Sequence, residues 1–162
     1  MRIRVLLLTL LLLAGCQRLE LDYEVKNGTR LPSFSVITDA GETLTSEYFC
    51  KGYGLIVFFH TECPDCQQEL PIIQNLYRQY GHKTRFIAIS RNQSLSEIEK
   101  YWSENELTIP FSAQEDAAVF SLFASHTVPR TYFIKDGVIV AQWDDNPTMT
   151  ENDFIKITTI SN

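Results

Sequence analysis

The sequence contains no run of basic residues and no stretch in which basic and aromatic residues alternate. Its 162 residues carry 14 Lys and Arg against 20 Asp and Glu, a formal net charge of −6. Because proteins bind nucleic acids largely through clustered positive charge, nucleic acid is not an expected partner. Internal repeats and low-complexity tracts are also absent, and a hydrophobic fraction of 44% is typical of a folded domain.

The sequence also lacks an apolar segment of the roughly 20 residues that comfortably span a bilayer. The apolar segment 5–13 is shorter, is broken by Thr9, and follows Arg2 and Arg4. Positive charge followed by a short apolar segment is typical of a signal peptide, so we expect residues 1–15 to form one. The remaining chain is long enough for one compact domain but hardly for two.

The tetrapeptide Leu13-Ala14-Gly15-Cys16 resembles the lipobox of bacterial lipoproteins. The resemblance implies cleavage before Cys16 and attachment of lipid to this residue. The polar and aperiodic residues after it are expected to form a tether, so that the lipidated N-terminus and its tether comprise residues 16–30. The chain would then be anchored in the lipid bilayer of the cell envelope, facing the periplasm or the cell exterior. The alternative is an ordinary secretory signal with a coincidental cysteine, and both interpretations place the protein outside the cytoplasm.

Cysteine is scarce, with four residues, and two of them stand three positions apart in Cys63-Pro64-Asp65-Cys66. The pair follows an apolar run over 55–59, which predicts a buried strand, and it precedes a helical pattern. One helical turn brings such cysteines to the Cα separation of about 5.5 Å that a disulfide prefers. The unpaired N–H groups of a helix N-terminus also stabilise a thiolate on the first cysteine. The spacing therefore predicts a redox-active site at Cys63 and Cys66.

A metal site is an alternative use of these cysteines. The spacing of His60, Cys63 and Cys66 is also that of metal ligands, and His126 could complete a zinc or copper site. However, the sequence has no second Cys-x-x-Cys and no His-x-x-His. Covalent haem attachment is excluded, because Gln67 rather than histidine follows the second cysteine.

Hydrophobic periodicity and turn residues predict an alternation of strands and helices. The predicted elements are, in order, a strand and hairpin over 34–41, a buried strand 55–59, a helix 64–80 with Pro71 inside it, a buried strand 86–89, a helix 95–102, a short extended segment 109–111, a brief helix 117–123, two strands 131–135 and 138–143, and a last helix 150–157. A capping box over 94–97 and a hairpin signal at Asp136-Gly137 strengthen two of these predictions. This order predicts an α/β fold of three α/β/α layers with a central mixed β-sheet.

Three segments resemble thioredoxin-fold proteins of the TlpA/ResA-like thiol–disulfide oxidoreductase family. They are Leu31-Pro32-Ser33-Phe34, the segment from Cys63 to Pro71, and Thr127-Val128-Pro129-Arg130-Thr131-Tyr132-Phe133 before the hairpin. The resemblance covers residues 31–143 and implies a thioredoxin-like domain over 31–162. It also implies that the Val128–Pro129 bond is cis and faces the two cysteines, so that the Val128 backbone binds an extended substrate.

Together with the export signal, the resemblance implies a membrane-anchored enzyme that exchanges disulfides with extracytoplasmic proteins. Cys63 would attack a substrate disulfide as a thiolate, and Cys66 would then attack Cys63 and release the reduced substrate. We expect no cofactor and no metal beside the redox-active pair, but a membrane electron donor would have to reset it. Because Glu62 and Asp65 place negative charge beside Cys63, we expect the reducing or isomerising direction.

Two other functions on the same fold stay open. One is a peroxiredoxin-like thiol peroxidase with Cys63 as peroxidatic thiol and Cys50 or Cys66 as its resolving partner. The approach to Cys63 lacks the Pro-x-x-x-Thr-x-x-Cys spacing that such an enzyme would want. The other is the copper or zinc carrier. Outside a peroxidase, Cys50 is most simply interpreted as a half-buried apolar residue.

The chain departs from the family pattern at several positions. Glu62 stands where tryptophan is common, and Val57 stands where thioredoxins place a buried carboxylate, so no proton acceptor is expected at that position. His60 could take a proton from Cys66, but we interpret it as a solvated surface residue. Arg130 stands where threonine is common, and it either steadies the thiolate or an acidic substrate, or pairs with a surface carboxylate.

Overall fold

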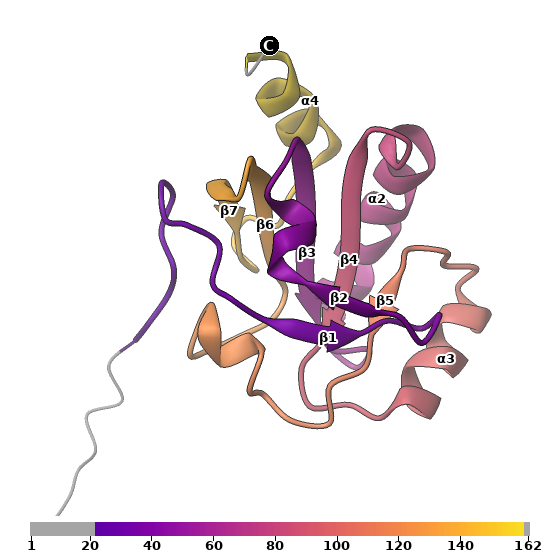
Figure 1. The fold of residues 1–162 in the computed structure, drawn as a ribbon. Helices are drawn as coiled ribbons and strands as arrows, with labels where there is room; N and C mark the ends of the chain where they lie inside the picture. Colours follow the sequence, from indigo (N-terminus) through magenta and orange to yellow (C-terminus); the bar gives the residue numbers. More distant parts are fainter. Residues whose placement is uncertain (1–21, 161–162) are drawn as a thin grey trace, which may run out of the picture.

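A five-stranded mixed sheet forms the centre of the computed structural model, which describes residues 22–160 (Figure 1). The strands follow the order β5-β4-β3-β6-β7 and comprise β3 (Tyr53–Phe59), β4 (Thr84–Ser90), β5 (Phe111–Ser112), β6 (Arg130–Lys135) and β7 (Val138–Trp143). β4 runs parallel to both β3 and β5, whereas β6 is antiparallel to β3 and to β7. The sheet is therefore mixed, as predicted.

The central strand β3 feeds the apolar core on both faces of the sheet. Successive side chains of a strand point to opposite faces. Accordingly, Leu55, Val57 and Phe59 join one buried cluster, and Ile56 and Phe58 join the other. Five consecutive apolar residues are thus explained by burial on both sides, which is typical of a central strand.

The two faces are covered by different kinds of structure. The first cluster contains the buried side chains of α2 (Pro64–Tyr80), α3 (Leu95–Glu104) and α4 (Glu151–Ile160). The second contains residues from the hairpin of β1 (Ser35–Ile37) and β2 (Thr43–Thr45), from the 3-10 helices η1 (Ser46–Phe49) and η2 (Phe120–Leu122), and from the adjoining loops. The predicted α/β fold class is confirmed, and one of its outer layers is built mainly from short turns.

Local signals in the sequence account for two well-defined boundaries. The N–H of Ser94 donates to Glu97 Oε2 at 2.9 Å, so the predicted capping box begins α3. Asp136 and Gly137 adopt positive φ angles of 50° and 77° between β6 and β7. These angles suit a two-residue hairpin whose twist matches its strands.

The predicted helix over 117–123 is wrong in kind and in length. Only the 3-10 helix η2 forms there, although Phe120 and Phe123 are buried as expected. The chain leaves this turn at once, because Ala124 forms an isolated bridge with Glu24. A contact with a residue 100 positions earlier in the sequence therefore ends a segment whose local pattern favours a longer helix.

The described part of the predicted tether packs against the domain. Val25 is buried and donates its N–H to the carbonyl of Phe123 at 2.8 Å, and Gly28 donates to Ile139 at 2.8 Å. These contacts tie the segment to the domain, and the domain start at residue 31 stays a prediction. We call residues 22–31 the N-terminal strap. In the sequence, its buried Val25 stands between polar residues, so no hydrophobic pattern indicates that the strap packs.

The predicted signal peptide (residues 1–15) and the lipid attachment site Cys16 lie outside the described residues and stay predictions. Within residues 22–160, none of the helices combines the length and the apolar character that crossing a membrane requires.

Candidate active site

Cys63 occupies the junction between β3 and α2. β3 ends at Phe59, and four loop residues lead to Pro64, the first residue of α2. Cys63 is the N-cap residue, with extended φ and ψ angles of −79° and 119°, and its sulfur accepts the N–H of Cys66 at 3.4 Å. Proline suits the first helical position because its missing N–H has no intrahelical partner there. The sulfur of Cys63 therefore lies at the positive end of a 17-residue helix.

The two cysteines of the pair differ in exposure. Both are thiols in the structure, with Cys63 half-buried and Cys66 fully buried. Burial raises the pKa of the Cys66 thiol well above its ordinary value, and the neighbouring Cys63 and Glu69 add to this effect, against the opposing influence of the His60 backbone. Cys66 therefore keeps its proton near neutral pH, while Cys63 is the sulfur that a substrate can reach.

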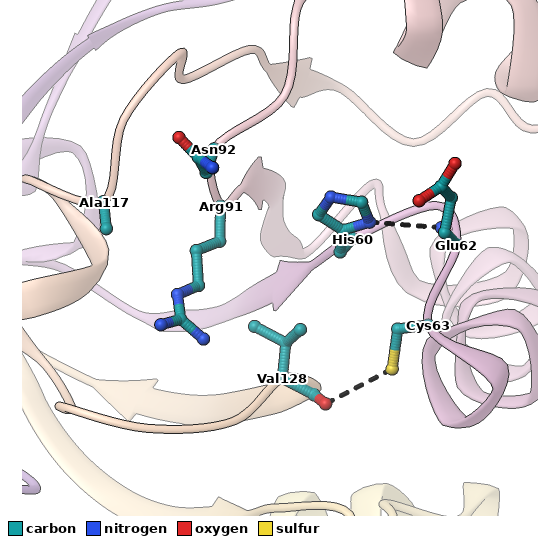
Figure 2. Close-up of a pocket in the computed structure, with 7 residues that line it drawn as sticks. All are labelled: His60, Glu62, Cys63, Arg91, Asn92, Ala117 and Val128. Atoms are coloured by element: carbon teal, nitrogen blue, oxygen red, sulfur yellow. Dashed lines mark hydrogen bonds between the residues drawn. The ribbon is translucent and has the colours of Figure 1, made fainter.

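The loop before β6 faces this pair. The Val128–Pro129 peptide bond is cis, and the Cys63 thiol donates to the Val128 carbonyl at 3.3 Å (Figure 2). The backbone of Val128 is thus placed beside the reactive sulfur, as the family resemblance implies. Its role in substrate binding is a proposal that we develop below.

An open groove surrounds the exposed sulfur. It encloses about 530 Å³, and its lining residues are His60, Glu62, Cys63, Arg91, Asn92, Ala117 and Val128 (Figure 2). They come from the loop after β3, the loop after β4, the segment before η2 and the loop before β6. The groove is open to solvent, so Cys63 can be reached through it.

Buried hydrogen bonds fix the loop that carries Cys63. The N–H of Thr61 donates to Gln93 Oε1 at 2.8 Å, and Gln93 Nε2 donates to Thr61 Oγ1 at 2.7 Å. Gln67 Nε2 adds a bond of 2.7 Å to the Thr61 carbonyl. The loops after β3 and β4 are consequently locked to each other and to α2.

A buried carboxylate lies beneath the pair, and the sequence analysis did not identify it. Glu69 is 1% exposed, and its Oε1 accepts from Thr131 Oγ1 at 2.9 Å and from the N–H of Met149 at 3.3 Å. Its Oε2 has no hydrogen-bond partner among the described residues. Burial raises the pKa of Glu69 to about 7, against the opposing effect of these hydrogen bonds.

Glu69 supplies a buried acid near Val57, the strand position at which the sequence predicts no carboxylate. Val57 pairs with Thr131 across the sheet, and Thr131 is the residue that bonds Glu69. The helix α2 therefore provides a carboxylate close to Val57, the strand position that lacks one. Its signal in the sequence is its spacing, because residues three apart on a helix, as Cys66 and Glu69 are, share a face.

The structure shows the partners of Arg130 and His60, two polar residues whose roles the sequence leaves open. Arg130 pairs with Glu24 of the N-terminal strap and lies 3.6 Å from Asp144 Oδ2, so it pairs with carboxylates of the protein itself. His60 is half-buried at the edge of the open groove, and its Nδ1 accepts the N–H of Glu62 at 3.2 Å.

The structure does not bring the predicted metal ligands together. His126 Nε2 lies 2.7 Å from Asp22 Oδ1 and lines a different pocket from His60 and Cys63. Over residues 22–160, no three or more His, Cys, Asp or Glu side chains are grouped as a metal site would require.

Cys50 lies at the other end of β3 from Cys63. It precedes the strand, whereas Cys63 follows it, and seven strand residues at about 3.3 Å each separate the two ends by roughly 20 Å. Cys50 is exposed, so the expectation of a half-buried residue is wrong. At this separation it cannot resolve an intermediate on Cys63 within one folded chain, because a disulfide requires Cα atoms within about 7 Å.

The sequence matches one family model and is similar to several known proteins. A family model described as the AhpC/TSA family matches residues 27–142. The thiol-disulfide oxidoreductase ResA of Oceanobacillus iheyensis is 31% identical over 87 residues, which are 52% of this chain and 45% of that protein. The chain therefore matches less than half the length of this relative. The thioredoxin-like protein YneN of Bacillus subtilis is 27% identical over 120 residues, 71% of this chain and 69% of the relative.

Solved structures share the fold at lower sequence identity. The thioredoxin domain of a thiol-disulfide oxidoreductase from Bacteroides vulgatus has a TM-score of 0.73 at 18% identity, with 86% of this chain and 100% of that chain covered. StoA from Bacillus subtilis has a TM-score of 0.67 at 20% identity, with 78% and 96% covered. These likenesses confirm the thioredoxin-like fold, and the matches to ResA confirm the predicted resemblance to TlpA/ResA-like proteins.

Proposed function

The chain belongs to the AhpC/TSA family, and we propose that it is a thiol–disulfide oxidoreductase whose redox pair is Cys63 and Cys66. One observation carries the proposal: a half-exposed sulfur caps α2 with a buried thiol one helical turn further on. The names of the similar ResA proteins support the same activity.

The exchange begins at Cys63. Its thiolate attacks one sulfur of a substrate disulfide, so that a Cys63–substrate bond forms, the substrate S–S bond breaks, and the electron pair leaves on the second substrate sulfur. An extended substrate lies in the groove and is aligned by the Val128 backbone, which already contacts the Cys63 sulfur. We therefore assign Val128 and Pro129 to the substrate-binding site.

Cys66 completes the exchange. It attacks Cys63 Sγ, forms the Cys63–Cys66 disulfide and releases the substrate as a dithiol, so that two electrons pass to the substrate. Cys66 must first lose its proton, which burial holds firmly. Glu69 interacts electrostatically with Cys66, and with its pKa of about 7 we assign it as the acceptor of that proton.

We place this activity outside the cytoplasm. The predicted lipid anchor at Cys16 would hold the domain on the cell-envelope membrane through the N-terminal strap. There it would act on extracytoplasmic proteins in the reducing or isomerising direction, and a membrane electron donor would return Cys63 and Cys66 to thiols. The exposed carboxylate of Glu62 and the half-exposed one of Asp65 support this direction, because negative charge beside a disulfide opposes its gain of two electrons.

The reduction potential of the pair tests the proposal. Soluble protein lacking residues 1–16 would be equilibrated in glutathione and dithiothreitol buffers, and its thiols counted by alkylation and mass. A potential near the roughly −270 mV of thioredoxin is expected for a reductant. A potential near the roughly −120 mV of a strong oxidant would contradict the direction alone. If Cys63 and Cys66 form no disulfide in any buffer, the redox function itself is wrong.

A further inference from the structure

The wall of the groove away from Cys63 carries a cation that the exchange chemistry leaves unused. Figure 2 shows Arg91 extending into the groove from the residue after β4, with Val128 between its guanidinium and Cys63 in this view. Ion pairs form at several other places within residues 22–160, but none of them includes Arg91. Arg91 therefore presents a positive charge to whatever enters the groove.

The guanidinium is held in place by its surroundings. The N–H of Arg91 donates to the carbonyl of Phe59 at 2.9 Å, which ties its backbone to the end of β3. Its guanidinium carbon lies 4.6 Å from the ring centroid of Phe120. Stacking on a ring occupies one face of the guanidinium and leaves the N–H groups at its edge available to a carboxylate.

The position of Arg91 relative to Cys63 is also fixed. Gln93 follows Arg91 by two residues and is bonded through its side chain to Thr61, two residues before Cys63. Asn92 donates its N–H to the carbonyl of Asp116 at 3.2 Å, which steadies the same loop from the other side. A substrate group that binds Arg91 is thus held at a defined place beside the reactive sulfur.

We propose that Arg91 selects disulfide substrates that carry an acidic side chain close to the cystine, an inference that rests on the function proposed above. The planar guanidinium edge matches a carboxylate and can bind it through two parallel hydrogen bonds. The protein as a whole repels acidic polypeptides, since its net charge is −6, so local positive charge is needed to admit one.

Glu62 sets the opposite preference elsewhere in the groove. In Figure 2 its carboxylate lies away from Arg91, with His60 between them. An acidic side chain on the Glu62 side of the cystine is repelled, whereas one on the Arg91 side is bound. The two charges together fix which way an acidic substrate lies in the groove.

The test uses synthetic peptides that each contain one intramolecular disulfide. In one series Glu, Gln or Lys stands before one of the cysteines, and in the other series it stands after that cysteine. Hydroxyethyl disulfide, a small uncharged disulfide, serves as the reference. Reduced full-length protein is mixed with each, and the rate constant is obtained from acid-quenched samples. The variants are Arg91→Ala, Arg91→Lys and the matched control Arg85→Ala. Arg85 belongs to β4, the strand that Arg91 follows, and its guanidinium also stacks on an aromatic ring, that of Tyr48.

We expect the Glu peptide to react about tenfold faster than the Lys peptide in at least one series, as a charge-assisted contact in an open groove would give. Arg91→Ala should abolish this preference and slow the Glu peptide far more than hydroxyethyl disulfide. Arg91→Lys should retain part of the preference, and Arg85→Ala should retain all of it.

The outcomes separate the two proposals. If the protein reduces hydroxyethyl disulfide and all peptides at rates that ignore charge in both series, the role of Arg91 is wrong and the exchange activity stands. If Arg91→Ala slows every substrate equally, including the uncharged one, Arg91 acts on the thiolate rather than on substrate choice. If wild-type protein reduces none of the substrates, the proposed function itself fails.

Discussion

The two ends of β3 present thiols in opposite surroundings. After the strand, Cys63 is half-buried, caps a 17-residue helix and receives the N–H of Cys66. Before the strand, Cys50 is more exposed, follows the four-residue η1, and its sulfur lies 3.9 Å from the carbonyl oxygen of Ser46. Both sulfurs contact a carbonyl oxygen, but only Cys63 also receives an amide N–H at the start of a long helix, so the less exposed cysteine is the one suited to exchange. Exposure alone does not identify a reactive thiol.

Removing the sulfur from either end of β3 is the strongest test of this contrast. Cys63→Ser is expected to abolish the reduction of any disulfide, because Cys66 is buried and Cys50 lies outside the groove. Cys50→Ser should leave the rate unchanged. Both rates are measured with hydroxyethyl disulfide and acid quenching, and activity that survives in Cys63→Ser would mean that another thiol begins the reaction.

Glu69 gives the Cys63 end a pH dependence that the Cys50 end lacks. Its folded pKa of about 7 lies above the ordinary 4.5, so between these values the folded protein holds a proton that the unfolded chain has lost. Stability should therefore fall as pH rises through this window, by about 3 kcal/mol. Glu69→Gln should remove the fall, as urea unfolding from pH 4.5 to 8 would reveal.

The exposed Glu99 provides the control for that experiment. Glu99→Gln on the surface of α3 should leave the pH dependence of unfolding as it is in the wild type. Glu69→Gln should in addition slow the second step of exchange above pH 7, where the wild-type carboxylate accepts the Cys66 proton. If Glu69→Gln instead retains the wild-type pH profile of both stability and exchange, the carboxylate is not the proton acceptor.

The bonds around Thr61 make the Cys63 end more rigid, and their loss should be measurable. Gln93→Ala leaves the buried N–H and hydroxyl of Thr61 without partners, which should lower the free energy of unfolding by about 2 kcal/mol. Gln79→Ala removes an exposed bond to Glu151 and should change it by less than about 0.5 kcal/mol. Equal effects in urea unfolding would contradict the buried network.

The smallest expected effect belongs to Cys50. Because its side chain is exposed, Cys50→Ser should change the free energy of unfolding by less than about 0.5 kcal/mol. Iodoacetamide should also modify Cys50 without loss of exchange activity when Cys63 and Cys66 are protected as their disulfide and then reduced. Inactivation by this modification would link the two ends of β3 in a way the structure does not suggest.

Elements with strong local signals could be predicted from the sequence, and those governed by distant contacts could not. The run Leu55–Phe59 lies within β3, and the turn Asp136-Gly137 joins β6 to β7 as predicted. Each depends on a pattern within about ten residues. Val25 and Phe123 are held by each other across almost 100 positions, so neither the packing of the N-terminal strap nor the early end of η2 is visible in a local pattern.

The residues of the candidate site also divide into those with a local signal in the sequence and those placed by distant contacts. Cys63 and Cys66 are identified by their spacing and by the strand and helix on either side. In the sequence, Glu69 is a charged residue of the kind usually found on a protein surface. It is buried only because Thr131 and Met149, 62 and 80 positions away, fold over it. Arg91 likewise belongs to the site only because its loop is bonded to the loop before Cys63.

The attacking sulfur can be identified directly by trapping the intermediate. Cys66→Ser protein, mixed with a peptide disulfide and quenched in acid, cannot release the peptide after the first step. We expect a single peptide adduct that tryptic mass mapping places on Cys63, with Cys50 unmodified. An adduct on Cys50, or none on either cysteine, would show that Cys63 does not begin the exchange.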